Sequence, residues 1–512
     1  MDALKDQHVL ILGLGHSGLA MVRWCVRQGA RVTVADTRET PPQLQALRSE
    51  LPDARFVAGA FDASLVEADD VRAVFKSPGL APADTAVVME AAAARGLWCG
   101  GELGLFAQAL ADLRETQAYA PVVLAVTGTN GKTTVAALTG QLIERAGRTV
   151  AVAGNIGPTL LDTLSGKLDA GDLPQVWVLE LSSFQLEFAG DFEPNAAALL
   201  NITQDHLDWH GSMPAYVEAK SHVFGRHAAM LLNREDPLVM SMPERLAPPV
   251  AQGKEARSKN RVQRERVTFG GDMPQRPGDF GVEVVNGMAW LVRALEADET
   301  RKRRRDDVEE IHIQRLMPAE ALRIRGRHNA VNALSALALA TAAGCPLGPM
   351  LYGLREYRGE PHRVESVGVV AEVEYFDDSK GTNVGATVAA LQGLGAERRI
   401  VAILGGEGKG QDFSPLAAPL ARHARAVVLI GRDAAIIRAA IEPSGVPLFD
   451  AASMEEAVSL AAQQARSGDA VLMSPACASF DMFDNYPHRG RVFCAAVQAQ
   501  AEAAGMAAGS PA

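Results

Sequence analysis

Short apolar runs alternate with longer amphipathic stretches along most of the chain, and this alternation predicts strands and helices in turn. Near the start, the apolar residues 8–12 lead into a glycine turn, a helical stretch and a second apolar run ending at Asp36. This order is typical of a βαβ unit with parallel strands. Another predicted strand ends at residues 77–79, and Ala-rich helical sequence follows to about Ala111. The first unit is therefore predicted to be α/β.

The same alternation occurs twice more along the chain. A second unit begins with an apolar run at residues 121–127, a glycine-rich loop and a helical stretch, and a third begins near Glu360. Further strands are expected at residues 149–154, 175–183, 196–203, 371–379, 398–406, 426–431 and 469–476. Alternating strands and helices favour parallel sheets with ligands at the carboxyl edge.

Two segments depart from this pattern. Between about residues 250 and 312 polar residues dominate, and the basic run Arg301–Arg305 is followed at once by Asp306, Asp307, Glu309 and Glu310. Charges of both signs favour a solvated loop over a nucleic-acid patch. The uncharged stretch Asn329–Leu354 contains prolines and asparagines. It predicts a buried Ala/Leu helix followed by a loop, because a membrane span needs about 20 mainly apolar residues.

Composition narrows the class of protein. At about 150 residues per domain, 512 residues predict roughly three domains. A net charge of −11 argues against a nucleic-acid binder, since such proteins usually carry an excess of basic residues. Five scattered cysteines predict neither a disulfide framework nor a metal site. With no secretory leader or membrane span predicted, we expect a cytoplasmic protein without membrane insertion, and a monomer.

A glycine fingerprint follows the first strand. Gly13, Gly15 and Gly18 have the spacing G-x-G-x-x-G, and Asp36 comes eighteen residues after Gly18. Such a turn lets phosphate approach the backbone at a helix N-terminus, and the acid can bind ribose hydroxyls. On its own the pattern favours NAD, then another nucleotide, with a purely structural turn as the remaining alternative.

The loop after the strand at 121–127 predicts a nucleoside triphosphate site. Its glycines expose backbone N–H groups, Lys132 can reach the β- and γ-phosphates, and Thr133 can bind Mg²⁺. Val126 stands where the common G-x-x-x-x-G-K-[ST] pattern has its first glycine. A glycine turn with a solvent-exposed lysine is the alternative.

Three residues downstream suit metal binding and phosphoryl transfer. Glu180 ends one strand, His206 follows another, and Lys220 lies on a helical stretch. Taken singly, each could be an edge carboxylate, a capping histidine or a surface lysine, and only the nearby phosphate loop favours the functional interpretation.

Other candidates have equally ordinary alternatives. Asn329 and Asn332 share one helix face and could pair with adenine, or could cap the helix. Charged loops of the third unit, including Arg363 and Lys409, suit anionic substrates or structural salt bridges. Cys477 is expected to be packed and not nucleophilic.

In combination these motifs resemble the Mur ligase family, the ATP-dependent amide-forming enzymes of peptidoglycan synthesis. The resemblance runs from about Lys5 to Cys494, apart from the polar segment near 250–312. It rests on GTNGKTT, ELSSFQLE, NITQDHLD, GRHNAVNA, PHRVE, DDSKGTN, GGEGKGQDF and SPACASFDMFDNY. The last three, with GLGHSG and DTR at the front, are most similar to members that add D-glutamate.

The resemblance implies three α/β domains, with a Rossmann-like domain at 1–115 for a UDP-linked substrate. A central P-loop-type parallel sheet at 116–359 would bind ATP and include the polar insertion. A C-terminal Rossmann-like domain at 360–512 would bind the amino acid. UDP-N-acetylmuramoyl-L-alanine and D-glutamate would be the small-molecule substrates, joined through an acyl phosphate.

The resemblance also assigns roles to individual residues. UDP would contact His16, Ser17, Asp36, Thr37, Arg38, Ser77, Pro78, Gly79 and Asn155. ATP would contact Gly128, Thr129, Asn130, Gly131, Lys132, Thr133, Thr134, Asn329, Asn332 and Arg363. Two Mg²⁺ ions would be held by Thr133, Glu180, His206 and a carbamylated Lys220. Asp378 would act with Lys132, His206, Lys220 and Arg363 in catalysis, and D-glutamate would meet Thr382, Lys409, Ser479 and Tyr486.

Four other interpretations remain at this point. A family member that adds a different amino acid and a folylpolyglutamate synthetase-like enzyme would share most motifs. An NAD-dependent dehydrogenase explains the first glycine motif and Asp36 but leaves the loop at Lys132 unused. A nucleotide-binding scaffold without activity leaves Glu180, His206 and Asp378 unexplained.

Overall fold

A computed structural model of the chain confirms the predicted α/β architecture. It describes residues 4–67, 70–247, 264–297, 310–396 and 398–505. The chain forms two compact units. One comprises Met1–Ile202, His206–Phe269 and Ser335–Met350, and the other comprises Thr203–Asp205, Gly270–Leu334 and Leu351–Ala512.

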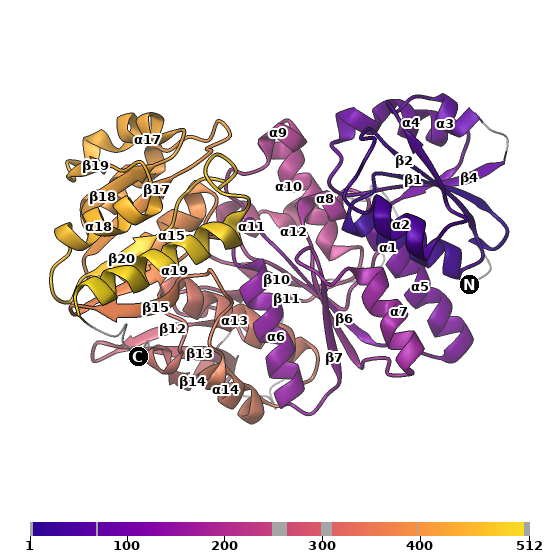
Figure 1. Ribbon diagram of the computed structural model, residues 1–512. Coiled ribbons are helices and arrows are strands. Elements are labelled where there is room, and N and C mark those ends of the chain that lie inside the picture. The colour runs from indigo at the N-terminus through magenta and orange to yellow at the C-terminus, as the bar shows by residue number, and fades with distance from the viewer. Residues whose placement is uncertain (1–3, 68–69, 248–263, 298–309, 397, 506–512) are drawn as a thin grey trace. The chain divides into compact units, whose positions relative to one another are not determined.

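The first unit begins with a five-stranded parallel sheet in the order β3-β2-β1-β4-β5, of which β1, β2 and β4 are labelled in Figure 1. Its strands are β1 (His8–Leu12), β2 (Arg31–Asp36), β3 (Arg55–Ala58), β4 (Val71–Lys76) and β5 (Trp98–Gly100). Its helices are α1 (His16–Arg27), α2 (Leu44–Glu50), α3 (Ser64–Glu67), α4 (Pro82–Ala94) and α5 (Glu102–Gln117). Strand order reverses between β1 and β4, so the loops after these strands lie side by side where α/β sheets bind ligands.

A six-stranded parallel sheet in the order β11-β10-β9-β6-β8-β7 completes this unit. Its strands are β6 (Val122–Thr127), β7 (Val150–Gly154), β8 (Val176–Glu180), β9 (Ala196–Leu199), β10 (Ala229–Asn233) and β11 (Arg266–Phe269). Its longer helices are α6 (Lys132–Arg145), α7 (Leu160–Ala170) and α10 (Met213–Ser221). Shorter elements are α8 (Ser183–Leu186), α9 (Leu207–His210), η2 (His222–Phe224), α11 (Pro237–Met240) and α12 (Met242–Arg245).

One hydrophobic core joins the two sheets of the first unit. Leu19 of α1, Phe106 of α5 and Leu164 of α7 are buried in the same cluster as Trp177 of β8. The rings of Phe106 and Trp177 meet edge to face with their centroids 5.1 Å apart. Packing of this kind fixes the loops of the first sheet relative to those of the second.

The second unit contains a six-stranded sheet in the order β15-β16-β20-β17-β18-β19. Its strands are β15 (Glu365–Val370), β16 (Val373–Asp377), β17 (Ile400–Gly405), β18 (Ala424–Ile430), β19 (Leu448–Asp450) and β20 (Ala470–Met473). Its helices are α15 (Val384–Gly395), η5 (Ser414–Leu416), α16 (Ala417–His423), α17 (Ala434–Ile441), η6 (Glu442–Ser444), α18 (Met454–Gln464) and α19 (Tyr486–Ala503). Separate hydrophobic clusters cover the two faces of this sheet, as in a doubly wound fold.

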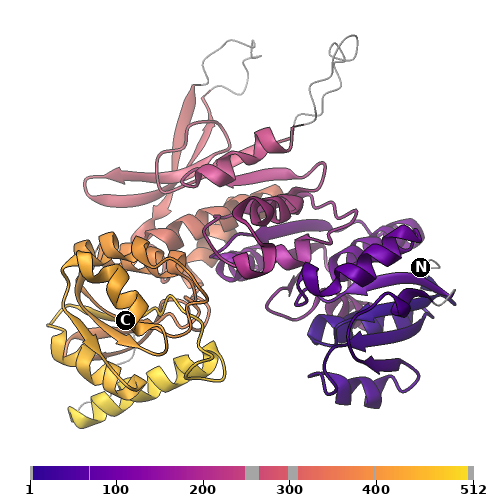
Figure 2. The same ribbon diagram turned by 90° about the horizontal axis from the view of Figure 1, so that it is seen from above.

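The prediction of a loop over residues 250–312 is wrong for the part that the structure describes. Strand β11 joins the central sheet, and β12 (Phe280–Val285), β13 (Met288–Glu296) and β14 (Ile311–Pro318) form a separate antiparallel sheet (Figure 2). Asn286 and Gly287 connect β12 to β13 with φ values of +51° and +81°, the Asn-Gly turn that favours a hairpin. The basic run Arg301–Arg305 lies outside the described residues.

Two smaller expectations also need correction. The stretch after α13 (Arg327–Ala342) forms a second helix, α14 (Leu347–Glu356), where a loop was expected. Its apolar positions recur at helical spacing, and Met350 and Leu354 are buried. Strand β15 pairs antiparallel with β16, so the six-stranded sheet of the second unit is mixed and not wholly parallel.

The remaining features agree with the composition. All five cysteines carry free thiols. Burial raises the pKa of the Cys477 thiol to about 12, in agreement with the packing role expected for it. In the described part of the chain, no helix is both long and apolar enough to cross a membrane.

Close helix–strand packing at Gly18 gives a stability prediction. A Cβ atom there would lie 2.0 Å from the carbonyl oxygen of Gly13. Gly18→Ala should therefore lower the free energy of unfolding by about 1–3 kcal/mol or more, measured by urea denaturation. Gly166→Ala is the control, because Gly166 lies in α7 with nothing within 4 Å and should gain up to about 1 kcal/mol. Equal stability of the two variants would contradict the packing described.

Candidate active site

The loops after β1 and β4 form the first part of the site. The Ser77 amide donates to the carbonyl of Leu12 at 2.8 Å, which holds the two loops together. Gly13 has a φ of +86°, a conformation that favours glycine. The two loops predicted to bind UDP therefore lie together at the strand-order switch of the first sheet.

Asp36 is held between a backbone amide and an arginine. Its carboxylate accepts from the Leu14 amide at 2.8 Å and from both Nε and Nη2 of Arg38 at 2.8 Å each. Burial alone would raise the pKa of Asp36, but the hydrogen bonds from Arg38 and Leu14 lower it below the usual value. Asp36 is thus an anionic acceptor, and its neighbours Thr37 and Arg38 are exposed.

The other residues predicted at this site have varied environments. Ser77 is buried, Pro78 is half-buried, and Gly79 is exposed. His16 lies near the Gln43 amide at the start of α1, and Ser17 interacts with Glu102. The side-chain amide of Asn155 donates to Glu180 Oε1 at 3.1 Å. It therefore touches the residue predicted to bind metal.

The phosphate loop runs from β6 into α6. Gly128 and Gly131 have φ values of +157° and +85°, and Gly131 is the N-cap of α6. The Asn130 amide donates to Asn201 Oδ1 at 2.8 Å, and Thr129 Oγ1 lies 3.0 Å from the Tyr216 hydroxyl. These bonds fix the loop against the end of β9 and against α10. Thr133 and Thr134 then form the first turn of α6, where backbone N–H groups favour anions.

Two lysines converge on this loop. Lys132 Nζ donates to the carbonyl oxygens of Gly128 and Thr129 at 2.8 Å each. Lys220 of α10 is buried and donates to the same Gly128 oxygen at 2.9 Å. The structure therefore brings together two cations that are 88 residues apart in sequence.

Glu180 lies on the strand beside the phosphate loop. It ends β8, is 4% exposed, and Val126 of β6 is its partner across the parallel ladder. Glu180 is thus a buried carboxylate at the end of the strand next to β6, and β6 leads into the loop before Thr133. Such a carboxylate is suitable for Mg²⁺, which prefers oxygen ligands. The hydroxyl of Thr133 and the carboxylate of Glu180 are oxygen donors that fit such an ion.

His206 is held by an aromatic cluster. It is the N-cap of α9 with a φ of +54°, and its ring meets that of Phe184 at 4.7 Å between centroids. Phe184 also contacts Trp209 and His210, at 4.6 and 5.7 Å. Burial, with the charge of Lys220 as a second cause, lowers the pKa of His210 to about 4. The ring contact with Phe184 sets the orientation of the His206 side chain.

In the second unit, Asp378 is one of the residues predicted to act in catalysis. It follows β16, accepts from Ser474 Oγ at 2.6 Å and is 6% exposed. Burial raises the pKa of Asp378 to about 7, although Ser474 and the nearby charge of Arg363 oppose this shift.

Asn329 and Asn332 share a helix face as predicted, since Asn332 Nδ2 donates to Asn329 Oδ1 at 3.1 Å.

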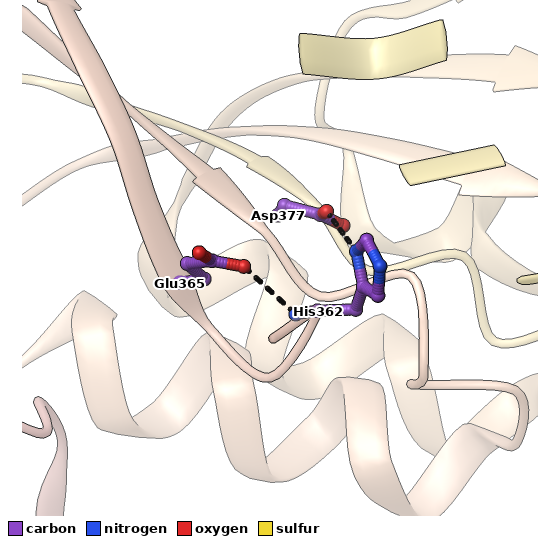
Figure 3. Close-up of side chains that lie close together, drawn as sticks. All are labelled: His362, Glu365 and Asp377. Atoms are coloured by element: carbon purple, nitrogen blue, oxygen red, sulfur yellow. Dashed lines mark hydrogen bonds and ion pairs between the residues drawn. The ribbon is translucent and has the colours of Figure 1, made fainter. Parts of the chain in front are cut away.

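A cluster missed by sequence reasoning lies beside Arg363 (Figure 3). His362 Nδ1 and Asp377 Oδ2 are 2.6 Å apart, and the His362 amide donates to Glu365 Oε2 at 2.9 Å. Among the described residues, these three form the one group of acids and histidines whose ligand atoms all lie within 4.8 Å of one another. Both carboxylates bond to His362 itself, so the group fixes the loop that carries Arg363.

Residues predicted for D-glutamate come from three loops of the second unit. Ser479 is buried, Thr382 is half-buried, and exposed Lys409 has its Nζ 5.9 Å from the centroid of Phe480. Tyr486 begins α19, and its hydroxyl accepts from Lys380 Nζ at 3.0 Å. The hydroxyl of Tyr486 therefore has a partner, and its ring also faces the Lys380 ammonium at 4.3 Å.

Arg489 connects these loops and was also missed. It is 1% exposed and donates to the carbonyl oxygens of Ser379, Cys477 and Ala478, and to Ser379 Oγ. Burial lowers the pKa of Arg489 to about 10, so it stays charged at neutral pH. One guanidinium thus fixes the loop after Asp378 to the loop before Ser479. Its helix lies far along the chain from the first loop, so no local motif reveals the contact.

Comparisons with known proteins agree with these observations. Residues 7–99 match the N-terminal domain of MurD-like Mur ligases, 126–274 the Mur ligase middle domain, and 362–477 the Mur ligase, glutamate ligase domain. A protein of Albidiferax ferrireducens named UDP-N-acetylmuramoylalanine--D-glutamate ligase is 69% identical over 99% of each chain. The chain belongs to the Mur ligase family. A Polaromonas protein of the same name is 60% identical, over 99% of this chain and all of that one.

Solved structures of the family share the fold at lower identity. The MurF ligase of Thermotoga maritima, in complex with ADP, has a TM-score of 0.56 at 15% identity, over 98% of this chain and 100% of that one. MurF of Acinetobacter baumannii has a TM-score of 0.55 at 18% identity, over 96% of this chain and 94% of that one. The three-domain architecture of Mur ligases is therefore the fold of this chain.

Arg489 gives a prediction for the second unit. Arg489→Met would remove the donor from the carbonyls of Ser379 and Cys477 and one of two donors from that of Ala478, so we expect the free energy of unfolding to fall by about 3 kcal/mol or more. Guanidinium chloride denaturation measures this change. Arg491→Met on the same helix is the control, because Arg491 is exposed and should change stability by less than about 0.5 kcal/mol. An equally small effect of Arg489→Met would refute its role in holding the loops.

Proposed function

We propose that this chain is an ATP-dependent ligase that joins D-glutamate to UDP-N-acetylmuramoyl-L-alanine. The observation that carries the proposal is 69% identity, over 99% of both chains, to a relative named for this reaction. The domains proposed are 1–115 for the UDP-linked substrate, 116–359 for ATP and 360–512 for the amino acid. Each matched family segment lies within one of them.

The chemistry proceeds through an acyl phosphate. An oxygen of the L-alanine carboxylate attacks the γ-phosphorus of ATP, a new P–O bond forms, and ADP leaves. The amine of D-glutamate then attacks the acyl carbon, loses a proton, and phosphate departs as the amide forms. Each reactant is anionic, so the enzyme must offset charge repulsion at every step.

Residues of the first unit would hold the two nucleotides. The loops at 13–17 and 77–79, with Asp36 and Arg38, would bind UDP, and the phosphate loop with Lys132 would bind ATP. Bound Mg²⁺ would neutralise phosphate charge, with Thr133 and Glu180 as ligands at one site. His206 and a carbamylated Lys220 would form a second, and carbamylation would convert that cation into an oxygen ligand.

Residues of the second unit would supply the remaining groups. Arg363 and Asp378 would act at the ATP phosphates and metal, and Asn329 and Asn332 would face adenine. Thr382, Lys409, Ser479 and Tyr486 would receive D-glutamate, with Lys409 pairing a carboxylate. Arg489 and the cluster around His362 support this assignment, because they fix the loops that carry Arg363, Asp378 and Ser479.

The proposed activity can be tested by ADP release with purified protein, Mg²⁺, ATP and UDP-N-acetylmuramoyl-L-alanine. D-Glutamate, L-alanine, diaminopimelate and L-lysine are added one at a time. Of the four amino acids, only D-glutamate is expected to cause ADP release. Preference for another amino acid would assign the chain a different reaction within the family. No release with any of them would refute the proposal.

Lys132→Ala tests the phosphate loop. Loss of the cation should reduce ADP release by at least about a hundredfold, because transferred phosphate would lose its counter-charge. Binding of UDP-N-acetylmuramoyl-L-alanine, measured by calorimetry, should persist. Lys167→Ala, in the exposed ion pair with Asp172, is the control and should keep full activity. Undiminished turnover of Lys132→Ala would remove this loop from the reaction.

Lys409→Ala tests the amino-acid site. We expect the KM for D-glutamate to rise about ten- to a hundredfold, because the loss of one charge-assisted hydrogen bond weakens binding by about this factor. The KM for ATP should stay within about twofold, since Lys409 is assigned no contact with nucleotide. Steady-state kinetics with each substrate varied in turn give both values. An equal rise in both KM values would argue against the proposed pairing.

A further inference from the structure

Lys76, the last residue of β4, has an unusual environment. Its side chain is 1% exposed, and its ammonium nitrogen is buried with no hydrogen-bond partner among the described residues. Burial lowers the pKa of Lys76 to about 8, and the charges of Glu187 and Asp84 oppose this shift without bonding to it. The strand thus ends in a buried ammonium that has no acceptor in the part of the chain that the structure describes.

Two aromatic rings surround this ammonium. Its nitrogen lies 4.8 Å from the ring centroid of Phe188 and 5.1 Å from that of Trp209. The indole Nε1 of Trp209 is itself buried and without a partner in the described part of the chain. Lys76 and Trp209 are therefore neighbours that each have a buried N–H donor without an acceptor among the described residues.

Packing alone does not account for a lysine here. Ring faces attract a cation, but this attraction does not replace the hydrogen bonds that a buried ammonium loses on leaving water. A hydrophobic residue of similar volume would fill the same space without that penalty. The other inward residues of β4, such as Val74 and Phe75, are apolar. A ligand that supplies a hydrogen-bond acceptor to the ammonium would explain why this position carries a lysine.

The location of the two donors suggests which ligand this is. Lys76 directly precedes the loop at 77–79, and Trp209 lies three residues after His206. Phe184 contacts both His206 and Trp209, so the donors lie between the proposed UDP loops and the proposed metal site. A substrate that extends from one site to the other passes this location.

We propose that Lys76 Nζ and Trp209 Nε1 donate hydrogen bonds to oxygen atoms of the bound UDP-linked substrate. The inference rests on the proposed function and adds two binding residues to it. Pyrophosphate and the acylated sugar both carry suitable acceptor oxygens. Trp209 is only half-buried, so rotation of its ring can admit the substrate to the covered ammonium.

Calorimetric titration of two variants tests this inference. Lys76→Met keeps the volume and removes the charge, and Trp209→Phe keeps a ring and removes the N–H. With UDP-N-acetylmuramoyl-L-alanine as the probe, we expect Kd to rise roughly ten- to a hundredfold for Lys76→Met. For Trp209→Phe we expect roughly three- to tenfold. The Kd for ATP should be unchanged in both.

The same titrations with UDP alone locate the acceptor. Loss of affinity for UDP as well would place it on the pyrophosphate, and loss for the full substrate only would place it on the acylated sugar. Both results support donation to the substrate. Unchanged Kd values for both ligands in Lys76→Met would overturn the inference.

A stability measurement separates a binding role from a structural one. Thermal unfolding of Lys76→Met should occur at the same temperature as wild type or higher, because an unpaired buried charge has been removed. A marked fall would show that Lys76 is needed for folding and would overturn the inference. Lys5→Met is the exposed control and should leave Kd unchanged. Wild type that binds no UDP-linked substrate would refute the proposed function itself.

Discussion

The carbonyl oxygen of Gly128 accepts hydrogen bonds from both Lys132 and Lys220, at 2.8 and 2.9 Å. One lysine begins the helix after the phosphate loop, and the other comes from α10. Their convergence depends on Gly128, where a Cβ atom would lie 2.9 Å from that of Leu200. The end of β6 therefore brings two lysines to the point where the proposed reaction places a triphosphate and a carboxylate. Lys132 would offset their negative charge, and a carbamylated Lys220 would supply an oxygen ligand for Mg²⁺. A local cation is needed here because both reactants are anionic, whatever the net charge of −11 on the whole chain.

Charged side chains also fix the loops at strand ends in the first sheet and in the six-stranded sheet of the second unit. At the strand-order switch of the first sheet, Asp36 is fixed by Arg38 and by the Leu14 amide, so the loop after β1 keeps one shape. In the second unit, Arg489 fixes the loops after β16 and β20 through their carbonyl groups. Exposed Arg38 and buried Arg489 thus hold loops in place, and loop N–H groups and other cations remain for ligands. The local charges, and not the net balance, determine what this protein binds.

Much of the fold could be predicted from the sequence, because the apolar runs and glycine loops are local patterns. The strands ending at Asp36, Thr127 and Glu180 were predicted for this reason. The hairpin around Asn286 was missed because the charged residues of its segment were given more weight than its turn. Arg489 and Lys76 were missed for a different reason. Their roles depend on contacts between distant segments, and no spacing along the chain encodes these contacts.

The central claim is that the L-alanine carboxylate is activated by phosphoryl transfer before the amine attacks. Isotope transfer tests it most directly, with both carboxylate oxygens of UDP-N-acetylmuramoyl-L-alanine labelled with ¹⁸O. Mass spectrometry of the phosphate released in the presence of ATP, Mg²⁺ and D-glutamate then measures the label. The account predicts one ¹⁸O atom in each phosphate and one retained in each amide. Phosphate without ¹⁸O, with amide still formed, would contradict it.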